Sequence, residues 1–318
     1  MCSGNERSMA ALPPGRCAMP ADAAQERARY FNSANAFNIH LDPVPARVFT
    51  EPAAAALGVD GPAGPATTGF FACDQSARLG CSWPATTPFM LARYARIAPG
   101  ASLDADFVAS GSIWYVIAGS GQARSDAGEV LDWACGDVFY LPAGAAILRA
   151  GGPRAAVLWL VTDEPLLAYH GLRPSRPGDA PVHFRSADIA AEIDRIHRSV
   201  PDAGTSGLAV VFSSETMQQR RNLMPALTLS LNTLPPGCAQ ASHRHNSAAL
   251  TLVVAGEGCH SRVDGQDCPW SDWATLVTPA GAPHSHHNPG SRRADFLIVQ
   301  DGGLYYEART MGFAFTGD

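Results

Sequence analysis

Six of the ten histidines in this chain lie between residues 243 and 287. His243 and His245 are separated by one residue, so on a β-strand both rings point to the same side of the sheet. His284 follows 41 residues after His243 and can come from a neighbouring strand. Because imidazole is a ligand for zinc, copper, iron and nickel, the spacing predicts one divalent metal ion held by His243, His245 and His284.

The segment that contains these histidines belongs to an internal repeat, which occurs twice in the sequence. Residues 98–169 align on residues 235–306 without a gap, at a constant offset of 137. Each copy consists of short apolar or alternating runs cut by Gly and Pro turns, a pattern typical of an all-β sandwich or barrel. The sequence therefore predicts two tandem barrels with a few short helices. The matching anchors are Pro99-Gly100 with Pro236-Gly237, Gly119 with Gly256, Gly121 with Gly258, Trp133 with Trp270, and Pro142 to Ala145 with Pro279 to Ala282.

Four regions follow from this organisation. Residues 1–85 are expected to form an N-terminal arm, disordered over residues 1–20, with a short helix in residues 21–35 and an extended segment after it. Residues 86–172 form the first barrel, and residues 173–222 a proline-rich linker with a helix that places Ile189, Ile193 and Ile196 on one face. Residues 223–318 form the second barrel.

Composition and charge favour a small-molecule partner. The formal net charge is −6, without long runs of either sign, so neither nucleic acid nor a membrane surface is indicated as a partner. The first 20 residues lack the apolar core of a signal peptide, and no run of 18 apolar residues occurs, so we expect a cytoplasmic protein. Its eight cysteines form no C-x-x-C pair and are expected to be reduced structural thiols.

The residues around the histidines resemble the two motifs of the cupin superfamily. The first motif has Gly, five residues, His-x-His, then Glu and a closing Gly, and the second reads Pro-x-Gly-x-x-His-x-x-x-Asn. This resemblance covers the two repeats and implies cupin barrels of the double-stranded β-helix, or jelly-roll, type. The matching positions are Gly237, His243, His245 and Gly256 in the first motif, and Pro279, Gly281, His284 and Asn288 in the second.

One departure from the cupin pattern bears on the chemistry. Position 249, where the glutamate ligand is expected, is alanine, and Leu250 follows it. Three neutral histidines keep the full +2 charge on the ion and leave three adjacent coordination positions open. Such a site favours an anionic chelating substrate together with a small third ligand such as O₂.

Within the cupins, the segments HRHNSAAL, VVAGEG and TPAGAPHSHHN resemble the gentisate and salicylate 1,2-dioxygenase group. That resemblance implies Fe(II) on His243, His245 and His284, and a proton-transferring role for His286. Thr251 stands where the group often carries an arginine for the substrate carboxylate, and it is a candidate substrate-binding residue. Arg262 is a second candidate for binding an anionic group, the alternative being an exposed position on the outer face of its strand.

The first barrel differs from the second at the ligand positions. At the same offset the three histidines correspond to Asp106, Val108 and Ile147, which cannot assemble an imidazole site. We therefore expect a metal-free first barrel that serves in packing, in a homodimer or homotetramer.

The leading functional hypothesis is an Fe(II)-dependent dioxygenase of aromatic compound catabolism, which cleaves the ring of a hydroxylated aromatic acid with O₂. Leu250, Val254 and Leu276 are expected to line its cavity and exclude water. One alternative is a non-redox metallo-cupin, a decarboxylase or isomerase with Zn, Mn or Ni. Another is a ligand-binding bicupin without turnover.

Overall fold

The computed structural model describes residues 8–36, 41–58, 67–174, 180–200 and 207–317, which form two compact units, one up to Pro43 and one from Val44 onward. Residues 1–20 were expected to be disordered. Residues 1–7 lie outside the described part of the chain, and residues 8–20 include the 3-10 helix η1 (Met9–Ala11). Residues 37–40 of the expected extended segment and residues 175–179 of the expected linker also lie outside them.

Polar contacts close the N-terminal unit. Helix α1 (Ala23–Arg27) begins after Asp22, whose carboxylate accepts a hydrogen bond of 2.8 Å from the backbone N–H of Gln25. Asn32 precedes the 3-10 helix η2 (Ser33–Asn35) and donates through Nδ2 to the carbonyl of Met9 at 2.9 Å. The described residues of this unit are exposed or half-buried, so the unit has no apolar core of its own there.

One eight-stranded antiparallel sheet forms the first barrel, with the order β2-β3-β8-β4-β7-β5-β6 and β9 paired to β7. The long strands β4 and β7 bend where their register shifts between Phe107 and Gly111. A Cβ atom on Gly111 would lie 2.4 Å from the Tyr140 ring, so this bend requires glycine. The strands are β2 (Gly69–Ala72), β3 (Leu91–Ile97), β4 (Ser102–Ala118), β5 (Ser120–Ser125), β6 (Val130–Ala134), β7 (Val138–Ala150), β8 (Ala156–Thr162) and β9 (Val182–Phe184).

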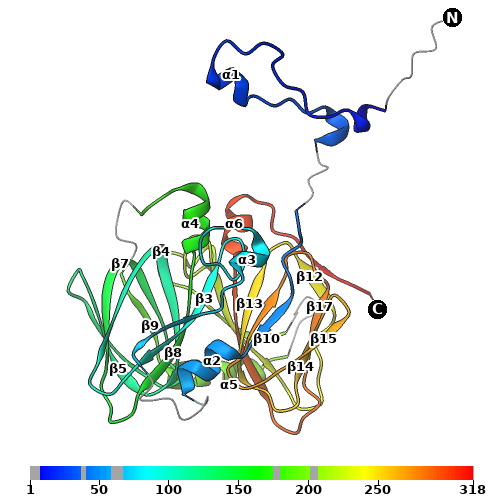
Figure 1. Ribbon diagram of the computed structural model, residues 1–318. Helices are drawn as coiled ribbons and strands as arrows, with labels where there is room; N and C mark the ends of the chain where they lie inside the picture. The colour runs from blue at the N-terminus through cyan, green and yellow to red at the C-terminus, as the bar shows by residue number, and fades with distance from the viewer. Residues whose placement is uncertain (1–7, 37–40, 59–66, 175–179, 201–206, 318) are drawn as a thin grey trace, which may run out of the picture. The chain divides into compact units, whose positions relative to one another are not determined.

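Two antiparallel sheets build the second barrel, beside the first (Figure 1). The six-stranded sheet has the order β1-β16-β13-β18-β11-β10, and the five-stranded sheet the order β15-β14-β17-β12-β19. The first comprises β1 (Arg47–Phe49), β10 (Leu208–Phe212), β11 (Thr228–Leu234), β13 (Ala249–Ala255), β16 (Thr275–Thr278) and β18 (Ala294–Gln300). The second comprises β12 (His243–His245), β14 (His260–Val263), β15 (Gln266–Pro269), β17 (His284–His287) and β19 (Phe313–Phe315).

Short helices follow β8 of the first barrel and β18 of the second. Asp163 precedes α4 (Glu164–His170), and its carboxylate accepts from the backbone N–H of Ser110 at 2.8 Å. Asp301 precedes α6 (Gly302–Glu307) and accepts from Ala248 N–H in the same way, also at 2.8 Å. Both copies of the repeat thus have a similar contact at this point, although the residues are 138 apart rather than 137. The other helices of this unit are α2 (Glu51–Leu57), α3 (Ser76–Leu79) and α5 (Ser186–His197), which buries Ile189 and Ile193.

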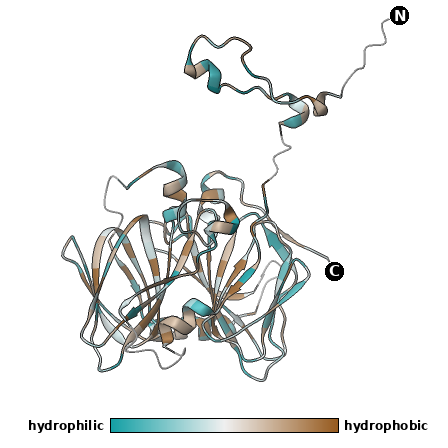
Figure 2. Cartoon of the chain, in the orientation of Figure 1, coloured by the Kyte–Doolittle hydropathy of each residue, from teal (hydrophilic) through white to brown (hydrophobic). Residues whose placement is uncertain are grey.

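The six-stranded sheet separates two different interiors. Because side chains alternate along a strand, one face of β13 packs Leu250 and Leu252 into a core shared with the first barrel. The other face of the sheet points into the second barrel. Thr275 on β16 joins the barrels, since Trp159 Nε1 donates to its hydroxyl at 2.9 Å and Tyr94 Oη lies 2.7 Å from it. Figure 2 shows hydrophobic and hydrophilic residues alternating along the strands.

These observations confirm the prediction of an all-β fold with two barrels and a few short helices. Strands β1 and β2 come from residues that we placed in the N-terminal arm, and they lie at the edges of the barrel sheets. The bounds of the four regions therefore stay a prediction.

The seven cysteines of the described residues are free.

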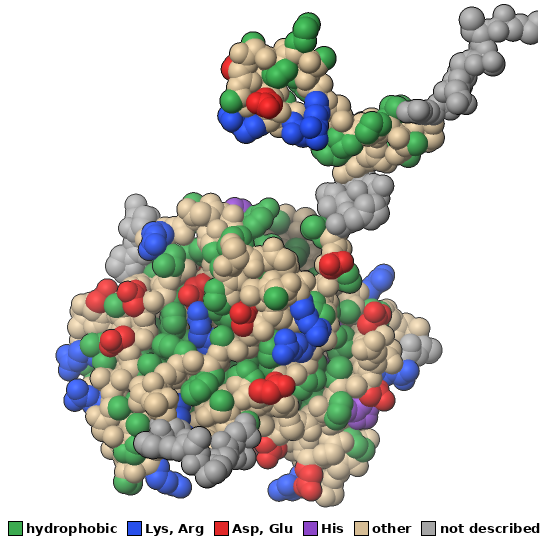
Figure 3. All heavy atoms as spheres, in the orientation of Figure 1, with side chains coloured by type: hydrophobic (Ala, Val, Ile, Leu, Met, Phe, Trp, Pro, Cys, Tyr) green, Lys and Arg blue, Asp and Glu red, His purple; other side chains and the backbone are tan. Residues whose placement is uncertain are grey.

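The surface carries charges of both signs. On the face in Figure 3, basic and acidic side chains are interspersed. Among the described residues, no helix combines the length and the apolar character needed to cross a membrane.

Candidate metal centre

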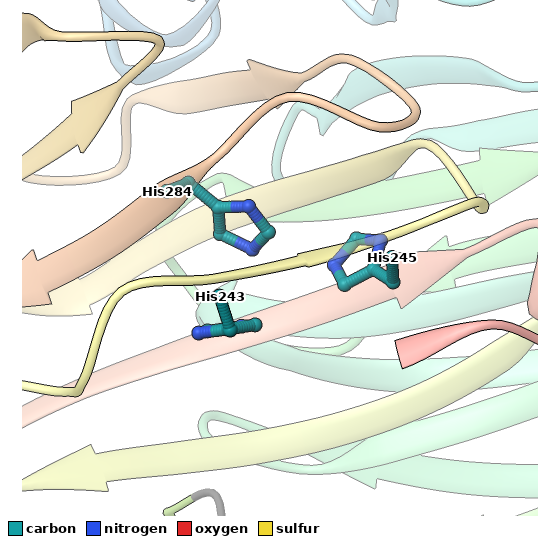
Figure 4. Close-up of side chains that lie close together, drawn as sticks. All are labelled: His243, His245 and His284. Carbon is teal, nitrogen blue, oxygen red and sulfur yellow. The ribbon is translucent and has the colours of Figure 1, made fainter. Parts of the chain in front are cut away.

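Strands β12 and β17 bring the three predicted ligands together. They are antiparallel neighbours, and His243 pairs directly with His284. Arg244 between the two β12 histidines is exposed, so His243 and His245 share the inner face. The rings of His243, His245 and His284 are buried and point toward one another (Figure 4), with ligand atoms that all lie within 4.8 Å of one another. Nitrogens that share one ion at about 2.1 Å stand about 3 to 4 Å apart, which small ring rotations achieve.

Backbone carbonyls fix the tautomer of each of these three rings. The Nδ1 atoms lie 2.9 Å from Ala241 O, 2.8 Å from Ser247 O and 2.9 Å from Ala282 O, for His243, His245 and His284 in turn. A carbonyl oxygen can only accept, so each Nδ1 carries the proton and each Nε2 keeps its lone pair. Metal-binding histidines are oriented by this kind of bond.

Burial keeps the three rings neutral. It lowers the pKa of His243 and of His245, and it lowers the pKa of His284 to about 3, with neighbouring histidines adding to the effect on His284. A histidine must lose its proton to bind a metal, so protons do not compete for these nitrogens at neutral pH. The three residues form a buried three-histidine metal site.

A cavity of about 860 Å³ opens onto the three histidines, in the size range of small-molecule sites. The described residues that line it include no Asp or Glu, whereas Arg220, Arg221 and Arg309 are among them. Its other polar lining residues are Gln219, Thr228, Ser230, Asn232, Gln240, Thr251, Thr278, His286, Gln300 and Tyr306.

The prediction named the wrong apolar residues for the lining of this cavity. Leu250, Val254 and Leu276 are not among the lining residues. Ala249 and Thr251 occupy the cavity face of β13, so Leu250 between them points into the core between the barrels. The cavity is lined by polar residues together with other apolar ones, among them Leu229, Ile298 and Phe313.

His286 lies on β17, two residues beyond His284, and lines the same cavity. Its Nδ1 is 2.7 Å from the hydroxyl of Ser261, which also accepts a 2.8 Å hydrogen bond from Trp270 Nε1. The ring is 2% exposed, and burial lowers its pKa well below the usual range. His286 is thus a neutral, oriented imidazole at a centroid distance of 6.0 Å from His284.

The two predicted substrate-binding residues occupy different places. Thr251 is buried and lines the cavity. Arg262 is exposed, because it alternates on β14 with buried Ser261 and Val263, and it does not line the cavity. Contact with a molecule bound beside the three histidines is therefore not available to Arg262 in this structure.

Gln300 and Thr278 were missed by the sequence reasoning. Gln300 Nε2 lies 3.2 Å from His245 Nε2, and Thr278 lines the cavity next to it. Gln300 follows an apolar run in the sequence, and Thr278 directly precedes the second motif, so neither carries a motif signal of its own. Only the strand register, which pairs Ala249 with both of them, reveals their position.

The fold of two barrels and the three-histidine site are both features found in the cupins. Residues 230–300, in the second barrel, match the cupin domain family, and the chain is similar in sequence to parts of gentisate and 1-hydroxy-2-naphthoate 1,2-dioxygenases. It is 38% identical over 81 residues to a gentisate 1,2-dioxygenase from Ralstonia, covering 26% of this chain and 23% of that protein. It is 26% identical over 182 residues to a 1-hydroxy-2-naphthoate 1,2-dioxygenase from Nocardioides, covering 55% and 46%. The chain thus aligns with less than half the length of these curated relatives.

A solved structure extends the comparison of the fold. Salicylate 1,2-dioxygenase from Pseudoaminobacter salicylatoxidans, crystallised with gentisate, superposes with a TM-score of 0.72 over 89% of this chain and 88% of its own. The two sequences are 12% identical, so the match concerns the fold. It confirms the two-cupin architecture that the repeat and the motifs predicted.

Proposed function

We propose that this protein is an Fe(II)-dependent dioxygenase that cleaves the ring of a hydroxylated aromatic acid. The observation that carries the proposal is the set of three neutral Nε2 atoms, without a carboxylate partner among the described residues, facing a cavity of about 860 Å³. The relatives named above act on such acids, according to their names.

The charge of the cavity supports an anionic substrate. Three neutral ligands leave the full charge of a divalent ion uncancelled. Three arginines line the cavity and no described lining residue is acidic. Arg220 and Arg309 both contact Glu307, whereas the structure records no ion pair for Arg221 among its described residues. A positive cavity attracts a carboxylate and rejects cations.

Protein groups hold and orient the substrate in this proposal. The fixed Nδ1–H bonds keep the three Nε2 atoms on one side, so the open coordination positions face the cavity. Gln300 Nε2 approaches the lone pair with which His245 would hold a metal, so on metal binding the Gln300 amide would be free to donate to a substrate oxygen. His286, held by Ser261, is placed to accept or return a proton of a substrate hydroxyl. Bound iron would supply Lewis acidity and the redox chemistry of O₂ activation.

Metal analysis and oxygen uptake test this proposal. The purified protein is loaded anaerobically with Fe(II) and offered gentisate, salicylate and 1-hydroxy-2-naphthoate in turn. A dioxygenase consumes one O₂ per ring cleaved and places both oxygen atoms in the product, which ¹⁸O₂ labelling reports. Full turnover under argon with Zn or Mn would instead establish the non-redox alternative.

The homo-oligomer predicted from the sequence is part of the same proposal. A dimer or tetramer would use the first barrel, whose interior is filled by stacked Trp114 and Phe139, as a packing element. The positions that correspond to the ligands, Asp106 and Ile147 among them, are exposed there. Light scattering of the metal-loaded protein would give the number of subunits.

A further inference from the structure

The cavity wall beside the metal site has a defined arrangement of side chains. Ala249 on β13 pairs with Thr278 on β16 and with Gln300 on β18. Thr251, the next inward residue of β13, lies diagonally opposite Thr278 on the same face. The small side chain of Ala249 therefore sits among two hydroxyls and an amide, at the position where a cupin with a glutamate ligand would carry its carboxylate.

Two of these groups have no hydrogen-bond partner in the described part of the chain. The hydroxyl oxygens of Thr251 and Thr278 are fully buried, and both residues are 1% exposed. A buried polar group without a partner is unfavourable, so native structures seldom keep one without a reason. Thr275, on the same strand as Thr278 and equally buried, has two partners. The unpartnered hydroxyls are thus confined to the cavity face.

We propose that Thr251 and Thr278 form a subsite that binds a ring hydroxyl of the substrate, apart from the oxygens held at the three histidines. This inference rests on the proposed function. A threonine hydroxyl donates and accepts, which matches a neutral hydroxyl group that does the same. A carboxylate only accepts and pairs better with arginine, and the arginines of this cavity lie elsewhere in its lining. The preferred substrate is therefore an aromatic acid with a second hydroxyl, as in gentisate.

Gentisate and salicylate provide the test, because they differ by one ring hydroxyl. Affinities are measured by calorimetry on the Fe(II)-loaded protein under argon, where no turnover occurs. We expect the wild-type protein to bind gentisate tighter than salicylate by roughly ten- to a hundredfold, the gain from one to two well-made hydrogen bonds in a buried site. In Thr251→Val/Thr278→Val this preference falls to about onefold, while the affinity for salicylate is unchanged.

Two further variants separate loss of the hydroxyl from a general disturbance. Thr278→Ser keeps the hydroxyl and retains the preference for gentisate. Thr310→Val makes the same chemical change on an exposed residue outside the cavity lining and leaves both affinities unchanged. Metal content and the urea midpoint of each variant show that it is folded and loaded.

The outcomes distinguish this subsite from the function on which it rests. Equal affinity of the wild-type protein for both acids, or a preference that survives in the double valine variant, would overturn the subsite and leave the dioxygenase proposal standing. If the loaded protein bound neither these acids nor 1-hydroxy-2-naphthoate, the proposed function and the subsite would both fall.

Discussion

Replacing either of two threonines on one short strand by valine should change the free energy of unfolding, in opposite directions for the two positions. Thr275 and Thr278 are the first and last residues of β16, and each is at most 1% exposed. The hydroxyl of Thr275 binds Trp159 Nε1 and Tyr94 Oη, whereas that of Thr278 has no partner among the described residues. Replacement by valine keeps the branched shape and removes only the hydroxyl.

The magnitudes follow from the hydrogen bonds. In Thr275→Val the indole N–H of Trp159 loses its partner in a fully buried place, so the free energy of unfolding should fall by about 1 to 3 kcal/mol. In Thr278→Val an unpaired buried hydroxyl is replaced by a methyl group, so the free energy of unfolding should rise by about 1 kcal/mol. Tyr94 keeps its bond to Trp273 O in both variants.

Urea unfolding of the metal-free protein, followed by tryptophan fluorescence, measures both changes under one condition. The unfolding slope must be the same in both variants and the wild type for the midpoints to be compared. If Thr278→Val lost more than about 1 kcal/mol, the Thr278 hydroxyl would have a partner in the free protein. The subsite proposed above would then lose its physical basis.

Three further predictions concern the site and its surroundings. His284→Ala should abolish stoichiometric metal binding by elemental analysis, whereas His287→Ala, on the same strand with its ring bonded to Ser285, should retain it. His286→Gln should keep the metal and lower kcat by about 10² to 10⁴, and an unchanged kcat would remove its proton-transfer role. Burial raises the pKa of Asp301 to about 7, so the folded state holds its proton more tightly than the unfolded chain and stability falls as pH rises from about 4 to 7. Asp301→Asn should remove the part of this fall that lies between pH 5 and pH 8, about 2.7 kcal/mol, as measured by urea unfolding at these two pH values.

The metal ligands could be predicted because their signal is local. Two histidines at i and i+2 share a strand face whatever the rest of the fold, and the third stands in a motif of fixed spacing. Both barrels also pack a tryptophan against a nearby glycine, Trp133 on Gly121 and Trp270 on Gly256, although the repeat aligns Gly256 with Gly119. Spacing of this kind survives without knowledge of the tertiary structure.

The cavity wall could not be predicted in the same way. Both faces of β13 are buried, so the run from Ala249 to Val253 does not reveal which residues face the cavity. For this reason Leu250 was wrongly predicted to line the cavity, although it lies on the opposite face of β13 from Ala249 and Thr251. Thr278 and Gln300 meet Ala249 through cross-strand register, which joins residues far apart in the sequence.

The two barrels share a fold but differ in their interiors. The first fills its interior with large apolar side chains, and Trp114 and Phe139 stack at 5.7 Å between ring centroids. The second keeps a polar cavity, and its own apolar cluster is limited to a few residues around Trp270 and Phe296. Unpaired hydroxyls and neutral imidazoles add little to folding, so the second barrel must draw its stability from the core that it shares with the first. That dependence gives the first barrel a structural role, although its residues at the matching positions are not metal ligands.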